Sequence, residues 1–262
     1  MTRRRWIADE VTGNTAALVG EHAAHLARVL RAEVGQEFDI ATGEDVRHGT
    51  ITTISNDRIE FALGAKQRLR LRSAAPKITL ALAIFKFDRM DWAIEKCTEI
   101  GVARIIPVIA RRTDAHLASA AVKRRERWQR IVRQAAEQSR RSAPPEIAAP
   151  VKLKDLEADG VLAGDALRVV LAESLAGSEG DTRLGEVLQS RSFGVQTEDQ
   201  VMLAIGPEGG WADGELTWFY DTGWVAASLG DTILRAETAA VVATALAFDA
   251  LHESITAFHN RL

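Results

Sequence analysis

Two glycine-bearing segments in the second half of the chain have the composition of ligand-binding loops. The first, Ile205 to Trp211, reads Ile-Gly-Pro-Glu-Gly-Gly-Trp and directly follows the apolar run Val201 to Ile205. Three glycines and a proline fix an unusual backbone path, and the missing Cβ atoms let a ligand approach the main chain. Ligands of open α/β sheets bind beyond the carboxyl ends of strands. A binding loop that carries one carboxylate, Glu208, is therefore favoured over a plain strand-to-helix turn.

The second segment, Leu229 to Ala240, reads Leu-Gly-Asp-Thr-Ile-Leu-Arg-Ala-Glu-Thr-Ala-Ala and also follows an apolar run. It opens a helix that is apolar almost all round, which must be buried on several sides, by its own sheet or by a second subunit. Glu237 falls in the first turn, where the helix dipole favours a carboxylate, and this alone explains its presence. The dipole does not explain Arg235 at the loop–helix junction, so Arg235 becomes a candidate for chemistry.

The two loops predict a ligand that need not carry phosphates. The chain contains neither a G-x-x-x-x-G-K-[ST] loop nor a strand-linked G-x-G-x-x-G. No Ser/His/Asp triad stands out, and the histidines lack a metal spacing such as H-E-x-x-H, so no metal is expected. S-adenosylmethionine fits these exclusions, since it offers an adenine edge for backbone hydrogen bonds and a sulfonium cation.

A basic helix is the third candidate. The spacing predicts a long helix over about residues 119–141, whose apolar face carries Trp128, Ile131, Val132, Ala135 and Ala136. Two acids, Glu126 and Glu137, offset eight bases, which are Lys123, Arg124, Arg125, Arg127, Arg130, Arg133, Arg140 and Arg141. Guanidinium forks match phosphate oxygens, whereas intrahelical pairs such as Arg133–Glu137 would describe an ordinary solvated helix. The excess of bases favours an RNA-facing surface.

The distribution of charge agrees with a polyanion partner for the first half. Residues 1–141 contain 26 of the 33 Lys and Arg but 17 of the 36 Asp and Glu, while the formal net charge is -3. A basic front and an acidic back indicate that one part contacts a polyanion. Solvated faces without a partner would give the same asymmetry, so charge alone leaves both interpretations open.

The elements that must position these residues fall into two domains, 1–73 and 74–262. Up to about residue 72, short stretches of period two surround one helical stretch, His22 to Leu30, which predicts a compact β-barrel. Residues 66–76 are expected to be the linker. From Lys77 onward, apolar strands alternate with helices, which predicts a mostly parallel sheet covered on both faces. Those strands are expected at 78–84, 105–109, 169–172, 201–205 and 225–229.

Local signals predict several element ends. Asp88 can cap the helix that ends at Gly101, and Pro107 suggests an edge or an irregularity in its strand. Pro144 and Pro145 are expected to halt the basic helix.

Length and composition bound the class of protein. The 262 residues are 47% hydrophobic, without an uninterrupted apolar stretch of about 20 residues, so no transmembrane helix is expected. The basic start has no apolar region after it, which argues against a secretory signal. Cys97 is the one cysteine and is expected to be a small buried side chain. A soluble cytoplasmic protein fits these features.

Together, the two loops resemble those of the SPOUT methyltransferases and, within them, the RsmE family, which methylates N3 of a uridine in 16S ribosomal RNA. The matching pieces are Ile205 to Gly210 and Leu229 to Ala239, although Ala236 stands where the family usually has Thr. Supporting pieces occur in the family's order at residues 25–31, 95–101 and 135–141, so the resemblance spans nearly the whole chain.

The resemblance implies an α/β domain with a deep trefoil knot, a PUA-like N-terminal barrel that helps to hold RNA, and a homodimer. It implies S-adenosylmethionine as cofactor, in a pocket formed by Leu171, Ala172, Glu173, Ile205, Gly206, Pro207, Glu208, Gly209, Gly210, Leu229, Gly230, Ile233, Leu234, Arg235, Glu237, Thr238 and Ala239. RNA contacts are expected from Arg4, Arg5, Arg28, Arg31, Arg133, Gln138, Arg140 and Arg141. The expected partner is 16S rRNA or the small ribosomal subunit.

The chemistry of uracil suggests roles for two residues. N3 carries a proton and is a poor nucleophile until that proton leaves, so the site needs a base and a group that stabilises charge on the flanking carbonyl oxygens. Arg235 is the candidate for charge stabilisation and Glu208 for the base, although Glu208 could equally be a structural carboxylate. The same fold acting on a ribose 2′-oxygen or on a tRNA guanine, and a non-catalytic RNA-binding assembly factor, are the alternatives.

Overall fold

The computed structural model describes residues 5–43, 45–66, 77–156, 166–173, 177, 182–191 and 201–259, without the side chains of residues 66 and 254–259. The chain divides into two compact units. Unit 1 comprises Met1–Arg72 with Arg133–Pro144, and unit 2 comprises Ser73–Val132 with Pro145–Leu262. Each unit is described by itself. Arg4 and most of the expected linker lie outside the described residues.

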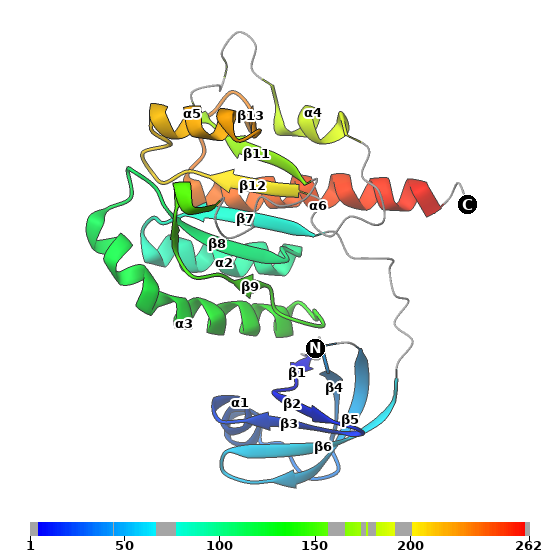
Figure 1. The fold of residues 1–262 in the computed structure, drawn as a ribbon. Coiled ribbons are helices and arrows are strands. Elements are labelled where there is room, and N and C mark those ends of the chain that lie inside the picture. The colour runs from blue at the N-terminus through cyan, green and yellow to red at the C-terminus, as the bar shows by residue number, and fades with distance from the viewer. Residues whose placement is uncertain are drawn as a thin grey trace. The chain divides into compact units, whose positions relative to one another are not determined.

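Unit 1 is built on a six-stranded sheet with the order β1-β4-β5-β6-β3-β2 (Figure 1). The strands are β1 (Trp6–Ile7), β2 (Glu10–Thr12), β3 (Thr15–Val19), β4 (Glu37–Ala41), β5 (Val46–Ile54) and β6 (Arg58–Lys66). Although β1 and β2 stand at opposite ends of this order, two residues connect them. The N–H of Ala8 donates to Ala41 on β4, and the next N–H, of Asp9, donates to Ala17 on β3 (both 2.9 Å). The sheet must therefore curl until its two ends meet.

The helical stretch expected in unit 1 forms one α-helical turn, which is followed by a π-helical turn. α1 (Glu21–Ala24) continues into a π-helix, η1 (His25–Val29), with Leu26 fully buried. Leu26 packs with Trp6, Leu18, Ile40 and Phe61 in the core of this unit. The short stretches of period two expected before residue 72 form strands of this sheet, among them β4, β5 and β6.

The end of the long helix α3 (Ala115–Gln138) also belongs to unit 1. Ala136 packs with Ile7, Ala41 and Val46, and the carbonyl of Glu137 accepts the N–H of Arg5 at 3.2 Å. The apolar period of this helix continues through both units, so the sequence pattern does not reveal that its last turns join the first part of the chain.

Unit 2 contains a seven-stranded sheet in which every pairing is parallel. Its order is β10-β8-β7-β12-β11-β13, with β9 beside β8. The strands are β7 (Ile78–Ala83), β8 (Arg104–Ile109), β9 (Glu146–Ile147), β10 (Val151–Lys152), β11 (Leu167–Leu171), β12 (Val201–Ile205) and β13 (Val225–Ala227). The predicted parallel sheet is therefore confirmed.

Alternate residues of these strands pack against opposite layers. Leu80, Ile105 and Leu203 point into a core with α2 (Phe87–Ile100), α3 and α6 (Ala236–His259). Ala81, Val108 and Ala204 point to the other face, where Trp211, Phe219 and Trp224 pack around α5 (Asp213–Asp221). A short helix, α4 (Leu184–Gln189), and a 3-10 turn, η2 (Leu153–Leu156), complete the two layers.

Pro107 lies where the partner of β8 is interrupted. On one side β9 pairs with Arg104 and Ile105, and β10 pairs with Val108 and Ile109, which leaves Pro107 between them. Since proline has no N–H to donate, an interruption of the ladder accommodates it, as the sequence suggested.

The observed ends of two helices correct two expectations. The N-cap of α2 is Lys86, and Asp88 lies within the first turn, where its charge still suits the dipole. α3 begins at Ala115 because Asp114 Oδ1 accepts the N–H of His116 at 3.1 Å, and it ends at Gln138, before Pro144 and Pro145.

The end of α2 requires the expected glycine. Gly101 has φ 133°, and a Cβ there would lie 2.7 Å from the ring of Phe248 on α6. Cys97, one turn earlier, is buried, and burial raises the pKa of its thiol to about 12, which fits a structural role. No helix among the described residues combines the length and apolarity needed to cross a membrane.

Candidate cofactor site

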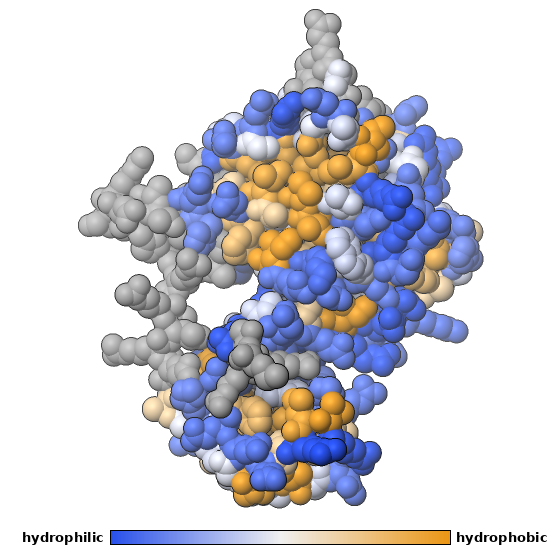
Figure 2. Space-filling model, turned by 180° about the vertical axis from the view of Figure 1, so that it is seen from behind, coloured by the Kyte–Doolittle hydropathy of each residue, from blue (hydrophilic) through white to orange (hydrophobic). Residues whose placement is uncertain are grey.

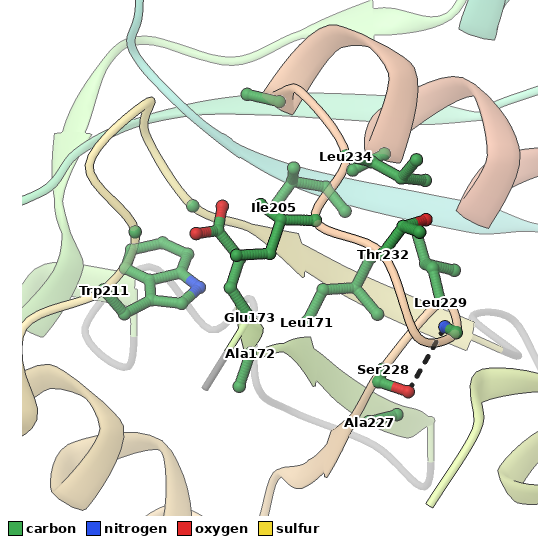
Figure 3. A pocket seen from close by; sticks show the side chains of 16 residues that line it. Leu171, Ala172, Glu173, Ile205, Trp211, Ala227, Ser228, Leu229, Thr232 and Leu234 are labelled. Atoms are coloured by element: carbon green, nitrogen blue, oxygen red, sulfur yellow. Dashed lines mark hydrogen bonds between the residues drawn. The ribbon is translucent and has the colours of Figure 1, made fainter. Parts of the chain in front are cut away.

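Three loops that leave neighbouring strands form a pocket at the carboxyl edge of the sheet in unit 2. β12, β11 and β13 are adjacent and parallel, so the segments after Ile205, Leu171 and Ala227 must emerge side by side. Figure 3 shows their side chains converging on one cavity. The lining consists of Leu171, Ala172, Glu173, Ile205, Gly206, Gly210, Trp211, Ala227, Ser228, Leu229, Gly230, Thr232, Ile233, Leu234, Ala236 and Ala239.

The loop after β12 is held in a tight turn. The N–H of Gly210 donates to the carbonyl of Pro207 at 2.8 Å, and Gly210 has φ 68°, a conformation that favours glycine. A Cβ at Gly206 would lie 3.3 Å from Nε1 of Trp211. Glycine at these two positions therefore lets the backbone turn tightly and brings the main chain to the pocket wall.

Two arginines from other parts of unit 2 hold this loop. Arg112, which follows β8, donates to the carbonyl of Gly209 at 2.6 Å and to that of Trp211 at 3.2 Å. Arg89, in the first turn of α2, donates to Oε1 of Glu208 at 3.0 Å and lies 3.8 Å from Oε1 of Glu237. Arg89 thereby links carboxylates from both glycine-bearing loops.

The loop after β13 is shaped by Ser228 and Gly230. The Oγ of Ser228 accepts the N–H of Gly230 at 3.3 Å, drawn as the dashed line in Figure 3, and Gly230 has φ 127°. α6 then begins at Ala236, with Glu237 in its first turn as predicted, and Glu237 is buried. One oxygen of Glu237, Oε2, is buried without a hydrogen-bond partner.

The electrostatics of the pocket suit a cation. Among its described lining residues, Glu173 is the one that carries a formal charge, and burial raises the pKa of its carboxyl group. Its side chain points into the cavity in Figure 3. The buried indole N–H of Trp211 has no partner, so a donor remains for a ligand. With no lysine or arginine in this lining, a phosphate would find no counter-charge there, whereas a sulfonium would find Glu173.

Eleven of the predicted cofactor residues line the pocket. They are Leu171, Ala172, Glu173, Ile205, Gly206, Gly210, Leu229, Gly230, Ile233, Leu234 and Ala239. Six others lie on the same loops but outside the lining: Pro207, Glu208, Gly209, Arg235, Glu237 and Thr238. Of the two predicted catalytic residues, Glu208 is ion-paired with Arg89, and Arg235 is exposed.

The predicted RNA contacts are divided between structural and exposed positions in unit 1. Arg133 donates to the carbonyl of Ile7 and pairs with Asp9, both at 2.6 Å. Arg5 donates to the carbonyl of Arg140, and burial lowers the pKa of Arg141 to about 10. The backbone of Arg140 is left-handed, with φ 61°. Exposed positions are Arg28, Arg31, Gln138 and Arg140.

Sequence reasoning missed Arg89 and Arg112 as parts of the site, and the predicted cofactor contacts also lacked the lining residues Trp211, Ala227, Ser228, Thr232 and Ala236. Arg112 had a usable signal, because it follows the carboxyl end of a predicted buried strand, the same edge from which the glycine loop leaves. Arg89 had none, since it reaches Glu208 across 119 positions of sequence. The described residues contain no group of three or more His, Cys, Asp or Glu that could hold a metal ion.

Comparison with known proteins shows which family and which relatives this chain is similar to. The model of the RNA methyltransferase domain family matches residues 72–247. A ribosomal RNA small subunit methyltransferase E from a Synechocystis species is 32% identical over 246 residues, which cover 90% of this chain and 74% of the relative. The enzyme of the same name from Mycobacterium tuberculosis is 32% identical over 235 residues, covering 88% and 85%.

Two solved structures share the fold over nearly the whole chain. A ribosomal RNA small subunit methyltransferase E from Neisseria gonorrhoeae, bound to S-adenosyl methionine, has a TM-score of 0.75 at 28% identity and covers 93% of this chain and 95% of its own. A putative methyltransferase from Legionella pneumophila, in complex with the cofactor SAM, has a TM-score of 0.75 at 30% identity and covers 96% and 97%.

Proposed function

The chain belongs to the RNA methyltransferase family, in its group of ribosomal RNA small subunit methyltransferases E, and from this premise we propose that it methylates N3 of one uridine in 16S rRNA. It is an S-adenosylmethionine-dependent rRNA methyltransferase. The observation that carries the proposal is the pocket at the ends of β11, β12 and β13, where the one charged residue among the described lining is a carboxylate.

The residues of this pocket fit the cofactor. S-adenosylmethionine supplies, when bound, an electrophilic methyl group on a cationic sulfur. Glu173 provides the counter-charge for that cation, and the apolar walls formed by Leu171, Ile205 and Leu234 exclude water from it. The glycine turns leave backbone N–H and C=O groups accessible for an adenine edge. Alignment for an in-line displacement follows from the rigidity that Arg112 gives to the loop.

Methylation at uracil N3 also requires the removal of one proton. We assign its acceptance to Glu208, which must part from Arg89 to receive it, and we assign stabilisation of the charge on the uracil carbonyl oxygens to Arg235. N3 then forms the new N–C bond as the C–S bond breaks. Both assigned residues lie close to pocket-lining residues in the chain, and Arg235 is exposed.

Two substitutions test these roles. Arg235→Ala and Glu208→Gln are each expected to slow single-turnover methylation by about 100-fold or more, as for the loss of a charge stabiliser or a general base, with cofactor affinity nearly unchanged. Calorimetry with S-adenosylmethionine measures that affinity separately. Unchanged turnover would remove the substituted residue from the chemistry. Weakened cofactor binding with Glu208→Gln would instead assign Glu208 to the support of the loop.

Mass mapping of the RNA tests the target base. Purified protein, S-adenosylmethionine and small-subunit RNA from a strain that lacks the gene are expected to yield a single added methyl group on uridine N3. A methyl group on a ribose 2′-oxygen, or on a guanine of tRNA, would replace this proposal by the same fold with another target. Absence of cofactor binding would favour a non-catalytic assembly factor.

We propose that unit 1 is a PUA-like barrel that holds RNA, and that the loops around the pocket belong to a deep trefoil knot. The meeting ends of β1 and β2 support the barrel. The order of β11, β12 and β13 supports close passage of the loops that would be knotted.

We also propose that the enzyme acts as a homodimer through the α6 side of unit 2, and that it works in the cytoplasm on the small ribosomal subunit. Figure 2 shows apolar side chains gathered in a broad patch on this unit. Leu246 is 41% exposed and Ile233 is 71% exposed. Leu246 borders a groove of about 250 Å³ with Ser228 and Leu229, which also line the cofactor pocket. A second copy on this groove would adjoin the cofactor site.

A further inference from the structure

A second basic surface lies in unit 2, on the part of the basic helix that belongs to this unit and away from the cofactor pocket. An open groove of about 360 Å³ runs between the start of α2 and the middle of α3. Its lining is Phe87, Ala120, Lys123, Arg124, Glu126, Arg127 and Arg130, so that four bases face one acid. The groove shares no residue with the cofactor pocket.

Asp91 holds two arginines of this groove in place. This aspartate of α2 is 9% exposed, and its Oδ2 accepts bonds from Arg124 at 2.7 Å and Arg127 at 2.8 Å. Its Oδ1 accepts the indole N–H of Trp128 at 3.0 Å. The guanidinium of Arg124 also lies over the ring of Phe87, 5.0 Å from its centre. Two guanidinium groups are thus fixed in place by one carboxylate.

This arrangement differs from a solvated helix face in which each charge finds a partner. The two carboxylates at the groove, Asp91 and Glu126, cannot neutralise Lys123, Arg124, Arg127 and Arg130 together, so a net positive charge remains. The side chain of Arg127 is 54% exposed, and Lys123 and Arg130 are exposed as well. Fixed arginine forks that keep donors toward solvent are suited to phosphate oxygens.

We propose that this groove binds the phosphate backbone of the RNA substrate, as a contact of unit 2 distinct from those expected of unit 1. The inference rests on the proposed RNA substrate. Arg127 and Arg130 lie three positions apart on one face of α3, and Lys123 lies four positions before Arg127, so three cations follow the helix in a row. Such a row matches the regular spacing of charges along a nucleic acid strand and carries no base specificity.

The double substitution K123Q/R130Q tests the groove without disturbing the bonds of Asp91. The probe is a naked small-subunit rRNA transcript, titrated at several salt concentrations. Affinity is expected to fall about tenfold or more near physiological salt, and the slope of log affinity against log salt is expected to decrease by roughly 1.4 to 1.8. The KM for RNA should rise while kcat stays near that of the unsubstituted enzyme.

A matched control removes two charges elsewhere on unit 2. Lys152 ends β10 and Lys154 lies in η2, and both are exposed, so K152Q/K154Q is expected to leave affinity and slope nearly unchanged. Equal affinities and slopes for the two double variants would overturn the proposal. So would a loss of affinity for the assembled small subunit with none for naked RNA, since the groove would then contact a ribosomal protein. Failure of the unsubstituted enzyme to methylate RNA would instead refute the proposed function.

Discussion

Among the described residues that line the cofactor pocket, Glu173 is the one that carries a formal charge. Its protonation should therefore control the affinity of the pocket for a cationic ligand. Burial raises the pKa of this carboxyl group above the ordinary range of glutamate. As the pH falls through this raised pKa, Glu173 becomes neutral and its counter-charge is lost. An exposed glutamate would lose its charge only at lower pH, so burial makes the site sensitive at a milder pH.

The substitution Glu173→Gln tests this linkage. In the unsubstituted enzyme, affinity for S-adenosylmethionine should weaken as the pH is lowered from about 8 to about 5, because binding requires the charged carboxylate. The glutamine variant should bind more weakly at the upper end of this range and lose most of the pH dependence. Calorimetry at several pH values measures both, with Glu126→Gln as a control outside the pocket. A variant with the same dependence as the parent would contradict the assigned counter-charge.

The structure places residues that look alike in the sequence in different surroundings. Arg133 and Arg127 both looked like RNA contacts on one helix. Arg133 donates a hydrogen bond to the carbonyl of Ile7 and forms an ion pair with Asp9, whereas about half of the side chain of Arg127 is exposed. Residue type and helical spacing are alike for both, so the difference comes from what lies opposite each of them.

Among the elements, α2 and α3 depend on one buried aspartate. Asp91 of α2 accepts bonds from Arg124, Arg127 and Trp128 of α3, so its removal leaves a buried indole N–H without an acceptor. Asp91→Ala is expected to lower the free energy of unfolding by about 2 kcal/mol, less than for a fully buried pair because both arginines are partly solvated. Urea denaturation measures this change.

Asp88→Ala is the matched control for this prediction. Asp88 lies in the first turn of the same helix, is exposed, and contributes mainly to the helix dipole. Its loss should cost about 0.5 kcal/mol. If the two variants were equally stable, the bonds to Asp91 would contribute nothing measurable between the helices.

For the molecule as a whole, the exposed apolar surface around Leu246 should govern association. Light scattering of the unsubstituted protein is expected to give the mass of two chains. Leu246→Glu should shift the mass toward one chain, because burying a charged carboxylate in an apolar interface costs desolvation energy. Val122→Glu is the control, since Val122 is 66% exposed on α3, away from this surface. A dimer that persists with Leu246→Glu would place the interface elsewhere.

Sequence alone determined the parallel sheet, the two loops, the glycine at the end of α2 and the class of ligand. These features are local, because apolar runs, periodicity and glycine density act on the chain within a few residues. The two-residue strands β9 and β10 escaped prediction, since a strand of that length shows no period. The tertiary structure decided which charged residues contact the binding loops. Arg112 reaches Gly209 across 97 positions, and Arg89 reaches Glu208 across 119. Only the folded sheet brings such distant residues within hydrogen-bonding range, so no local pattern could assign them.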